Sequence, residues 1–145
     1  MANKPHSNLT IENVGVQSTI YLIKIDGRPS YVGQTNNLER RSREHRKSLE
    51  NGKHKNMKLQ KRYLASYPAE IEIVPILELC TDNKLVTYFA ESLAISYFQY
   101  DVVNNPVICE RGANVKLPYV QQDIAEILLR DIAEFYNTKL NLNVY

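Results

Sequence analysis

The chain has 145 residues, 43% of them hydrophobic, and a formal net charge of +2. This length fits one domain with a real core, and no stretch approaches the run of roughly 18 apolar residues that a membrane span needs. The polar N-terminus lacks the apolar centre of a signal peptide, so we expect a cytoplasmic protein without a membrane partner. The two cysteines lack CxxC spacing and a nearby pair of histidines, which argues against a zinc site or a disulfide framework.

Charge is distributed unevenly along the chain. Met1 to Arg62 carry 13 Lys and Arg residues against 5 Asp and Glu, whereas Tyr63 to Tyr145 carry 5 against 11. A polyanionic partner would therefore meet the first part of the chain. Cations are densest from Glu39 to Arg62, although such a run by itself is more often a solvated helix face than a binding site.

The first regular element is predicted over residues 19–25, TIYLIKI. Its alternation is typical of a strand with two faces, formed by Ile20 and Leu22 on one side and by Tyr21, Ile23 and Ile25 on the other. DGRPS then supplies Gly and Pro for a reversal and YVG resumes extended chain, so residues 19–33 predict a β-hairpin. Tyr21 and Tyr31 would lie on neighbouring antiparallel strands, where their side chains can act together.

A helix is predicted to begin at Asn36 or Asn37, either of which can cap it, and to run through Leu49. Arg41 and His45 lie one turn apart in it, beside its apolar stripe. Burying two cationic side chains costs free energy unless an anionic or hydrogen-bonding partner is present. We therefore expect Arg41 and His45 to have a functional or structural partner.

Two helices and a strand are expected next: a basic helix over 56–65, a strand over 69–79 and an apolar helix over 81–100, capped by Thr81 or Asp82. Pro75 indicates that the strand ends, bulges or lies at a sheet edge. Between Lys84 and Asp101, the last of these helices carries Glu91 as its only charge.

A C-terminal helix is predicted over residues 118–136. Its expected apolar stripe comprises Val120, Ile124, Ile127, Leu128, Ile132 and Phe135. Its four acidic residues lie largely off this stripe, so a polyanion is an unsuitable partner for the helix. We expect this stripe to pack on the domain or to form a dimer interface.

Five of these residues would suit phosphodiester hydrolysis if the fold brought them together: Tyr21, Tyr31, Arg41, His45 and Glu91. Glu91 could hold a divalent cation, because Mg²⁺ takes most of its ligands from water and substrate phosphate. Arg41 could bind the phosphate bidentately. Tyr21 or His45 could accept the proton of the attacking water, and the residues alone leave that choice open.

Each of these residues also has a structural interpretation. Tyrosines in a hairpin are usually core residues whose hydroxyl group reaches solvent. Arg41 could simply pair with Glu91, and a lone His45 could be a satisfied structural histidine. His54 is expected to contact phosphate or to be exposed rather than to take part in catalysis.

Order and spacing decide between these interpretations. TIY, a hairpin, YVG, an inward arginine one turn before a histidine, a later glutamate and then an asparagine together resemble the GIY-YIG nuclease family over residues 19–106. The resemblance implies an α+β domain with a three-stranded antiparallel sheet flanked by helices. It also implies a metal-dependent site made of Tyr21, Tyr31, Arg41, His45, Glu91 as the metal ligand and Asn104, with Asn105 as the alternative to Asn104.

This resemblance suggests three segments: an N-terminal tail over 1–17, a nuclease domain over 18–106 and a C-terminal helical extension over 107–145. HRKSLENGKHKNMKLQ is similar to the corresponding region of phage-type homing endonucleases. The long DNA-reading extension of many homing enzymes is not seen, since only about 40 residues follow Pro106 and they carry a net negative charge. Specificity is then built into the domain, is low, or comes from a partner.

We therefore predict a DNA endonuclease that requires Mg²⁺ or Mn²⁺ and acts on double-stranded DNA in a bacterial or phage-infected cell. The expected DNA contacts are Arg43, Arg46, Lys47, Lys53, His54, Lys55, Lys58, Lys61 and Arg62. The alternatives are a nucleic-acid-binding module without turnover and a repair nuclease that cuts only when partners position it. A homodimer through the tail helix is a further hypothesis.

Overall fold

A computed structural model describes residues 15–110 and 113–145, so most of the predicted tail lies outside the described residues. Three strands, β1 (Ser18–Ile25), β2 (Arg28–Thr35) and β3 (Ile71–Leu79), form an antiparallel sheet in the order β2-β1-β3. The helices are α2 (Leu38–Glu50), α3 (Met57–Ala65), α4 (Lys84–Tyr97) and α5 (Gln122–Phe135). A second hairpin, β4 (Val107–Glu110) and β5 (Ala113–Lys116), follows α4. The predicted α+β fold with a three-stranded antiparallel sheet and a C-terminal helix is confirmed.

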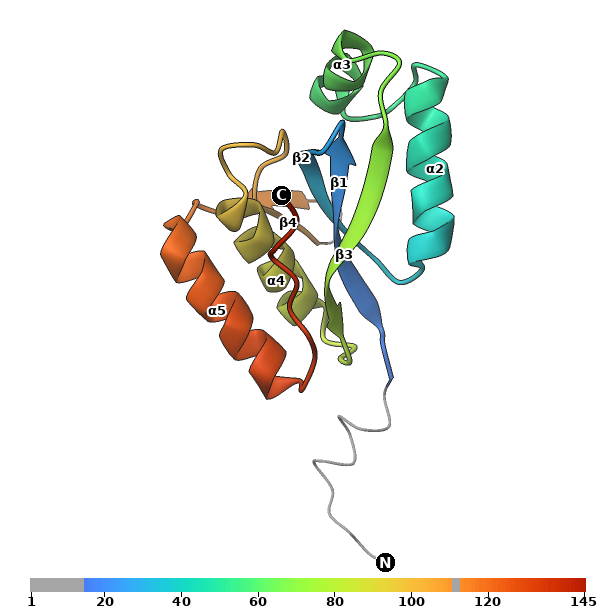
Figure 1. Cartoon of the computed structure of the whole chain (residues 1–145). Coiled ribbons are helices and arrows are strands. Elements are labelled where there is room, and N and C mark those ends of the chain that lie inside the picture. The colour runs from blue at the N-terminus through green and yellow to red at the C-terminus, as the bar shows by residue number, and fades with distance from the viewer. Residues whose placement is uncertain (1–14, 111–112) are drawn as a thin grey trace, which may run out of the picture.

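The sheet separates two cores, as the alternation in β1 predicts (Figure 1). One face carries Ile20 and Leu22 and packs against α4 and α5. The opposite face carries Tyr21, which packs in a cluster with residues of α2 and α3. Figure 1 shows α2 on one side of the sheet and α4 and α5 on the other. The face of β1 that holds Tyr21 is therefore covered by the basic helices.

The hairpin between β1 and β2 is tighter than predicted. Only Asp26 and Gly27 form the turn, and both have positive φ angles, 49° and 78°, as a two-residue type I′ turn requires. The residues that follow, expected to belong to the reversal, are already in β2. A register shift between Ile23 and Lys24 accommodates them, and Pro29 is tolerated because β2 is an edge strand.

The two helices on the Tyr21 side begin where asparagines cap them. Asn37 Oδ1 accepts a hydrogen bond from the Arg40 N–H at 3.0 Å, which selects Asn37 from the two predicted caps. Asn56 Oδ1 likewise accepts from the Leu59 N–H at 3.0 Å. His45 is buried on the inner face of α2, as its stripe position predicts.

The other two predicted elements are confirmed with corrected ends. Pro75 lies in β3 opposite Tyr21, next to a register shift and on a sheet edge, so the proline marks both a bulge and an edge. The predicted caps of α4 were wrong by one or two residues. Asn83 Oδ1 caps this helix through the Leu85 N–H at 3.0 Å, and the helix ends at Tyr97 instead of Tyr100.

The predicted apolar stripe of the C-terminal helix was wrong for three of its members. Small residues make the buried face of α5, which packs on α4; they are Ala125 and Ala133, with Leu129 between them. Ile124, Ile127 and Phe135 are exposed instead. Alanines allow two helices to approach closely, and volume outweighs hydrophobicity at such a contact.

The last residues of the chain return to the sheet. Leu140 forms an isolated antiparallel bridge with Leu77 of β3, and Leu142 and Val144 are buried in the cluster on the α4 face. The Tyr145 hydroxyl donates a hydrogen bond to Asp101 Oδ2 at 2.6 Å. Residues after the predicted nuclease domain thus contribute to the same hydrophobic core as its strands.

Candidate active site

The site is built around Tyr21, which is 1% exposed at the centre of β1. Its hydroxyl lies 2.6 Å from His45 Nε2. His45 Nδ1 lies in turn 2.8 Å from Nε2 of His54, from the loop between α2 and α3. The Tyr31 ring meets both imidazoles edge-on, at centroid distances of 5.5 Å to His45 and 6.1 Å to His54. The fold therefore joins two predicted tyrosines, one predicted histidine and a second histidine that was expected at the DNA surface.

Burial sets the protonation states of this cluster. Burial and the neighbouring Tyr31 raise the pKa of Tyr21 well above its usual range, and the Arg41 guanidinium opposes that rise. Burial lowers the pKa of His45 to about 3, and the nearby Arg41 and His54 contribute to that fall. Burial also lowers the pKa of His54. Without substrate, Tyr21 is a phenol and both imidazoles are neutral near pH 7.

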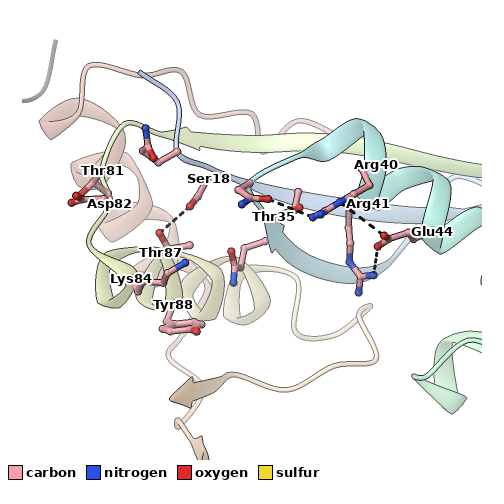
Figure 2. Close-up of a pocket in the computed structure, with 13 residues that line it drawn as sticks. Ser18, Thr35, Arg40, Arg41, Glu44, Thr81, Asp82, Lys84, Thr87 and Tyr88 are labelled. Atoms are coloured by element: carbon pink, nitrogen blue, oxygen red, sulfur yellow. Dashed lines mark hydrogen bonds and ion pairs between the residues drawn. The ribbon is translucent and has the colours of Figure 1, made fainter. Parts of the chain in front are cut away.

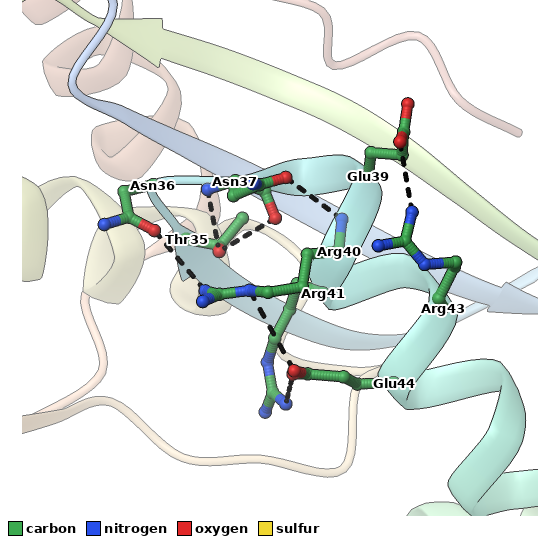
Figure 3. Close-up of polar contacts among 8 residues, drawn as sticks. All are labelled: Thr35, Asn36, Asn37, Glu39, Arg40, Arg41, Arg43 and Glu44. Atoms are coloured by element: carbon green, nitrogen blue, oxygen red, sulfur yellow. Dashed lines mark hydrogen bonds and ion pairs between the residues drawn. The ribbon is translucent and has the colours of Figure 1, made fainter.

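Arg41 lies at the edge of the cluster, where it pairs with Glu44 (Figure 3). It does not form the ion pair with Glu91 that the sequence offered. The distance from its Nη1 to Glu44 Oε1 is 3.0 Å, and its side chain is 38% exposed. Arg40 is 3.9 Å from the other oxygen of the same carboxylate. Exposed ion pairs contribute little to stability, so Arg41 can exchange Glu44 for a phosphate at low cost.

Glu91 extends from α4 close enough for its charge to raise the pKa of Tyr21. Burial raises the pKa of Glu91 itself to about 7. Among the described residues, no lysine or arginine lies within ion-pair distance of this carboxylate, and no group of three or more His, Cys, Asp or Glu is suited to a metal. A half-buried carboxylate without a cation partner fits a divalent ion that takes its other ligands from water and phosphate.

The two candidate asparagines occupy different positions. The Asn104 side chain both accepts from the Val32 N–H at 3.2 Å and donates to the Val32 carbonyl, next to Tyr31 in β2. Asn105 instead accepts a hydrogen bond from the Tyr119 hydroxyl at 2.6 Å. Asn104 is therefore the asparagine that borders the cluster, and its side chain holds the end of the α4 segment against β2.

A hollow of about 540 Å³ adjoins Arg41 between the end of β2 and the start of α4 (Figure 2). Arg40, Lys84 and Tyr88 line it together with Arg41, and none of these three was among the predicted site residues. One signal could have found two of them: Lys84 and Tyr88 are one turn apart on the helix of Glu91.

The predicted DNA contacts divide into two groups. Seven are exposed: Arg43, Arg46, Lys47, Lys53, Lys55, Lys58 and Lys61. The two others, His54 and Arg62, are half-buried and make contacts within the protein, and Arg46 also makes one although it is exposed. Arg46 donates to the Ile71 carbonyl at 2.7 Å, and Arg62 donates to the Ser30 hydroxyl at 3.2 Å and to two backbone carbonyls.

No helix within residues 15–110 and 113–145 combines the length and apolar character needed to cross a membrane. Comparisons with curated proteins and with solved structures return no match. A family model described as the GIY-YIG catalytic domain matches residues 17–93, more than half of the chain. This range contains both tyrosines, Arg41, both histidines and Glu91. The chain therefore belongs to the GIY-YIG family and carries its nuclease domain.

Proposed function

We propose that this nuclease is a divalent-metal-dependent DNA endonuclease whose site comprises Tyr21, Tyr31, Arg41, His45, Glu91 and Asn104. The observation that carries the proposal is the 2.6 Å contact between the Tyr21 hydroxyl and His45 Nε2. It lies beside an exchangeable arginine and a carboxylate without a cation partner among the described residues. These groups can position a phosphodiester, stabilise its negative charge and take a proton from water.

Arg41 leaves Glu44 and binds two oxygens of the scissile phosphate. Tyr21 in its phenolate form takes one proton from a water molecule, which attacks phosphorus as the P–O bond to the leaving oxygen breaks. That oxygen takes a proton from solvent, so the products are a phosphate monoester and a hydroxyl. Tyr31 orients the water or the phosphate, and Asn104 keeps the strand of Tyr31 in position through Val32.

Glu91 would hold the cation, Mg²⁺ or Mn²⁺, which when bound supplies positive charge for the phosphate oxygens and favours ionised Tyr21. A bound cation would also offset the desolvation that raises the pKa of Glu91 to about 7. The cation would therefore stabilise ionised Glu91 in the protein without DNA as well as during the reaction.

Double-stranded DNA is the proposed substrate, held by the exposed cations of α2, α3 and the loop between them. One site hydrolyses one phosphodiester bond, so a double-strand break needs two visits or two copies of the chain. Light scattering at micromolar concentration, with and without DNA, tests the homodimer. The mass of one chain in the sample without DNA, and of one chain plus one duplex in the sample with DNA, removes it.

The test of function is cleavage of supercoiled plasmid by wild type, Arg41→Ala and Glu91→Ala, each with Mg²⁺, with Mn²⁺ and with chelator. Arg130→Ala is the control, because Arg130 is an exposed arginine that pairs with Glu126 at 2.8 Å on α5, outside the proposed DNA surface. We expect metal-dependent cutting by wild type and by the control only. Cutting that persists in chelator contradicts the role of the metal.

Two results would select the alternatives. Salt-sensitive binding to DNA without cutting under any metal identifies a binding module. Cutting of flaps or bubbles with plain duplex left intact identifies a structure-dependent nuclease that relies on partners.

A further inference from the structure

The sequence assigned His54 to the DNA surface, but the fold places its ring directly behind His45. Three contacts connect the backbone to the reactive phenol in one line. The Asn56 N–H donates to His54 Nδ1 at 3.0 Å, His54 Nε2 meets His45 Nδ1 at 2.8 Å, and His45 Nε2 meets the Tyr21 hydroxyl at 2.6 Å. The first contact has a fixed direction, because a backbone N–H can only donate.

That fixed direction sets the protons of both rings. His54 Nδ1 accepts from Asn56, so a neutral His54 carries its proton on Nε2. This N–H must donate to His45 Nδ1, and a neutral His45 then carries its own proton on Nε2. His45 consequently offers an N–H, and not a lone pair, to Tyr21.

The geometry of the two imidazoles supports a strong contact between them. The rings are nearly parallel, with an interplanar angle of 14°, and their centroids are 5.1 Å apart. The centroid separation is nearly equal to the 2.8 Å distance between the two nitrogens plus the distance from each nitrogen to the centre of its own ring. Such a sum is reached only when both centroids and both nitrogens lie on one line. The rings therefore meet edge to edge in one plane, where the N–H of one points at the lone pair of the other.

His54 is itself held from behind. Its backbone N–H donates to Gln60 Oε1 at 2.8 Å, and Gln60 Nε2 donates to the Leu49 carbonyl at 3.0 Å. Gln60 belongs to α3 and is buried, at 7% exposure, against the end of α2. The loop that carries His54 is thus fixed to both helices. Turning the imidazole over would take Nδ1 away from the Asn56 N–H and break their 3.0 Å hydrogen bond.

We propose that His54 is a positioning residue that locks His45 in its Nε2–H tautomer, so that His45 donates a hydrogen bond to Tyr21 and does not accept its proton. The consequence for catalysis, which rests on the proposed function, is that Tyr21 is the base. A hydrogen bond from His45 stabilises the phenolate, and the phenolic hydrogen of resting Tyr21 points away from His45.

The tautomer is measurable in the resting protein. We would record ¹⁵N–¹H correlation spectra of the imidazoles in metal-free, DNA-free wild type at pH 7, and assign His45 and His54 with the variants His45→Gln and His54→Gln. We expect His45 to carry its proton on Nε2, with Nδ1 unprotonated. A proton on His45 Nδ1, or exchange between both tautomers, overturns the proposal.

Variants then separate positioning from phosphate contact. His54→Gln keeps a side-chain N–H donor near the place of Nε2, whereas His54→Leu removes it. We expect single-turnover cleavage at saturating DNA to fall at least about tenfold in His54→Leu and to recover in part in His54→Gln, with DNA affinity and its salt dependence unchanged in both. Weaker DNA binding with an unchanged saturating rate would show that His54 contacts phosphate and would contradict our proposal.

The spectra require no activity, so the two proposals fail separately. If wild type cuts no DNA but shows the Nε2–H tautomer, the proposed function fails and the role of His54 stands. If wild type cuts DNA and His45 is protonated on Nδ1, the nuclease assignment stands and the role of His54 is wrong.

Discussion

Tyr21 and Gly33 face each other across β1 and β2, and the phenol ring lies where a side chain at residue 33 would be. A Cβ built on Gly33 would lie 2.4 Å from the Tyr21 hydroxyl oxygen and 2.5 Å from Cζ. The glycine that ends the YVG motif is therefore needed for space. Its φ angle is not in the region that favours glycine.

Gly33→Ala should therefore displace Tyr21 from His45. Tyr21 is buried in a packed core, so we expect a loss of about 1–3 kcal/mol in the free energy of unfolding, together with a strong reduction of single-turnover cleavage. Gly52→Ala is the control: Gly52 has a φ of 71° and nothing near its Cβ, so it should lose about 1 kcal/mol of stability and keep its activity. Equal activity of the two variants would contradict this role of Gly33.

Stability should fall in acid because of His45. Its pKa is about 3 in the folded protein and 6.5 in the unfolded chain, so between these values the unfolded state binds more protons and is favoured as pH falls. Above pH 6.5 His45 is neutral in both states, and its protonation does not reduce stability. Between pH 6.5 and about 3, each pH unit of acidification lowers the free energy of unfolding by up to about 1.4 kcal/mol through this residue. Urea unfolding at several pH values should show a shallower acid dependence in His45→Gln than in wild type. Parallel curves for the two proteins would exclude His45 as the cause.

Glu44→Gln should strengthen DNA binding, because it removes a carboxylate that pairs with Arg41 at 3.0 Å. Glu39→Gln makes the same charge change on the same helix, but Glu39 pairs with Arg43 on the exposed side. We expect the gain in affinity to be roughly threefold greater for Glu44→Gln, and larger at low salt. Fluorescence anisotropy with a labelled duplex measures both, and equal gains would mean that only net charge matters.

Substitutions of the exposed lysines should change the salt dependence of DNA binding, whereas substitution of a structural arginine should change the stability of the fold. Replacing Lys55 and Lys61, both exposed, with Ala should lower the slope of log affinity against log salt by about one for each lysine that binds a phosphate, with little change in stability. Salt titrations of binding measure that slope. A slope equal to that of wild type would remove both lysines from the DNA surface.

Arg62→Ala should instead destabilise the fold. Its guanidinium connects α3 to the Ser30 hydroxyl and to two backbone carbonyls, and removing it leaves these acceptors without that donor. We expect a loss of about 1–3 kcal/mol in the free energy of unfolding, measured by urea denaturation. Lys61→Ala is the matched control on the same helix, and an equal loss in both variants would contradict the structural role of Arg62.

Much of the site followed from local sequence. The alternation in TIYLIKI placed Tyr21 opposite Ile20, and helical spacing placed His45 on the inner face of α2. Both inferences depend only on the period of a strand or a helix, which residues a few positions apart already define. The asparagine cap of α2 was also predictable, since capping joins an asparagine to an N–H three residues away.

Contacts between distant segments could not be read in this way. The position of His54 behind His45, the use of Arg62 inside the protein and the attachment of Asn104 to Val32 all depend on how separate elements approach one another. The face of α5 was misjudged for the same reason, because closeness of packing selected alanines over larger apolar residues.

The sequence by itself thus determined which residues are chemically capable and which faces they occupy, since local periodicity and capping are properties of short segments. Only the tertiary structure decided that Arg41 rests on Glu44, that Glu91 is near Tyr21 with no cation partner among the described residues, and that a backbone N–H at Asn56 orients the histidines. Distances of a few ångströms between segments far apart in the chain fix these relationships, and no local pattern encodes such distances.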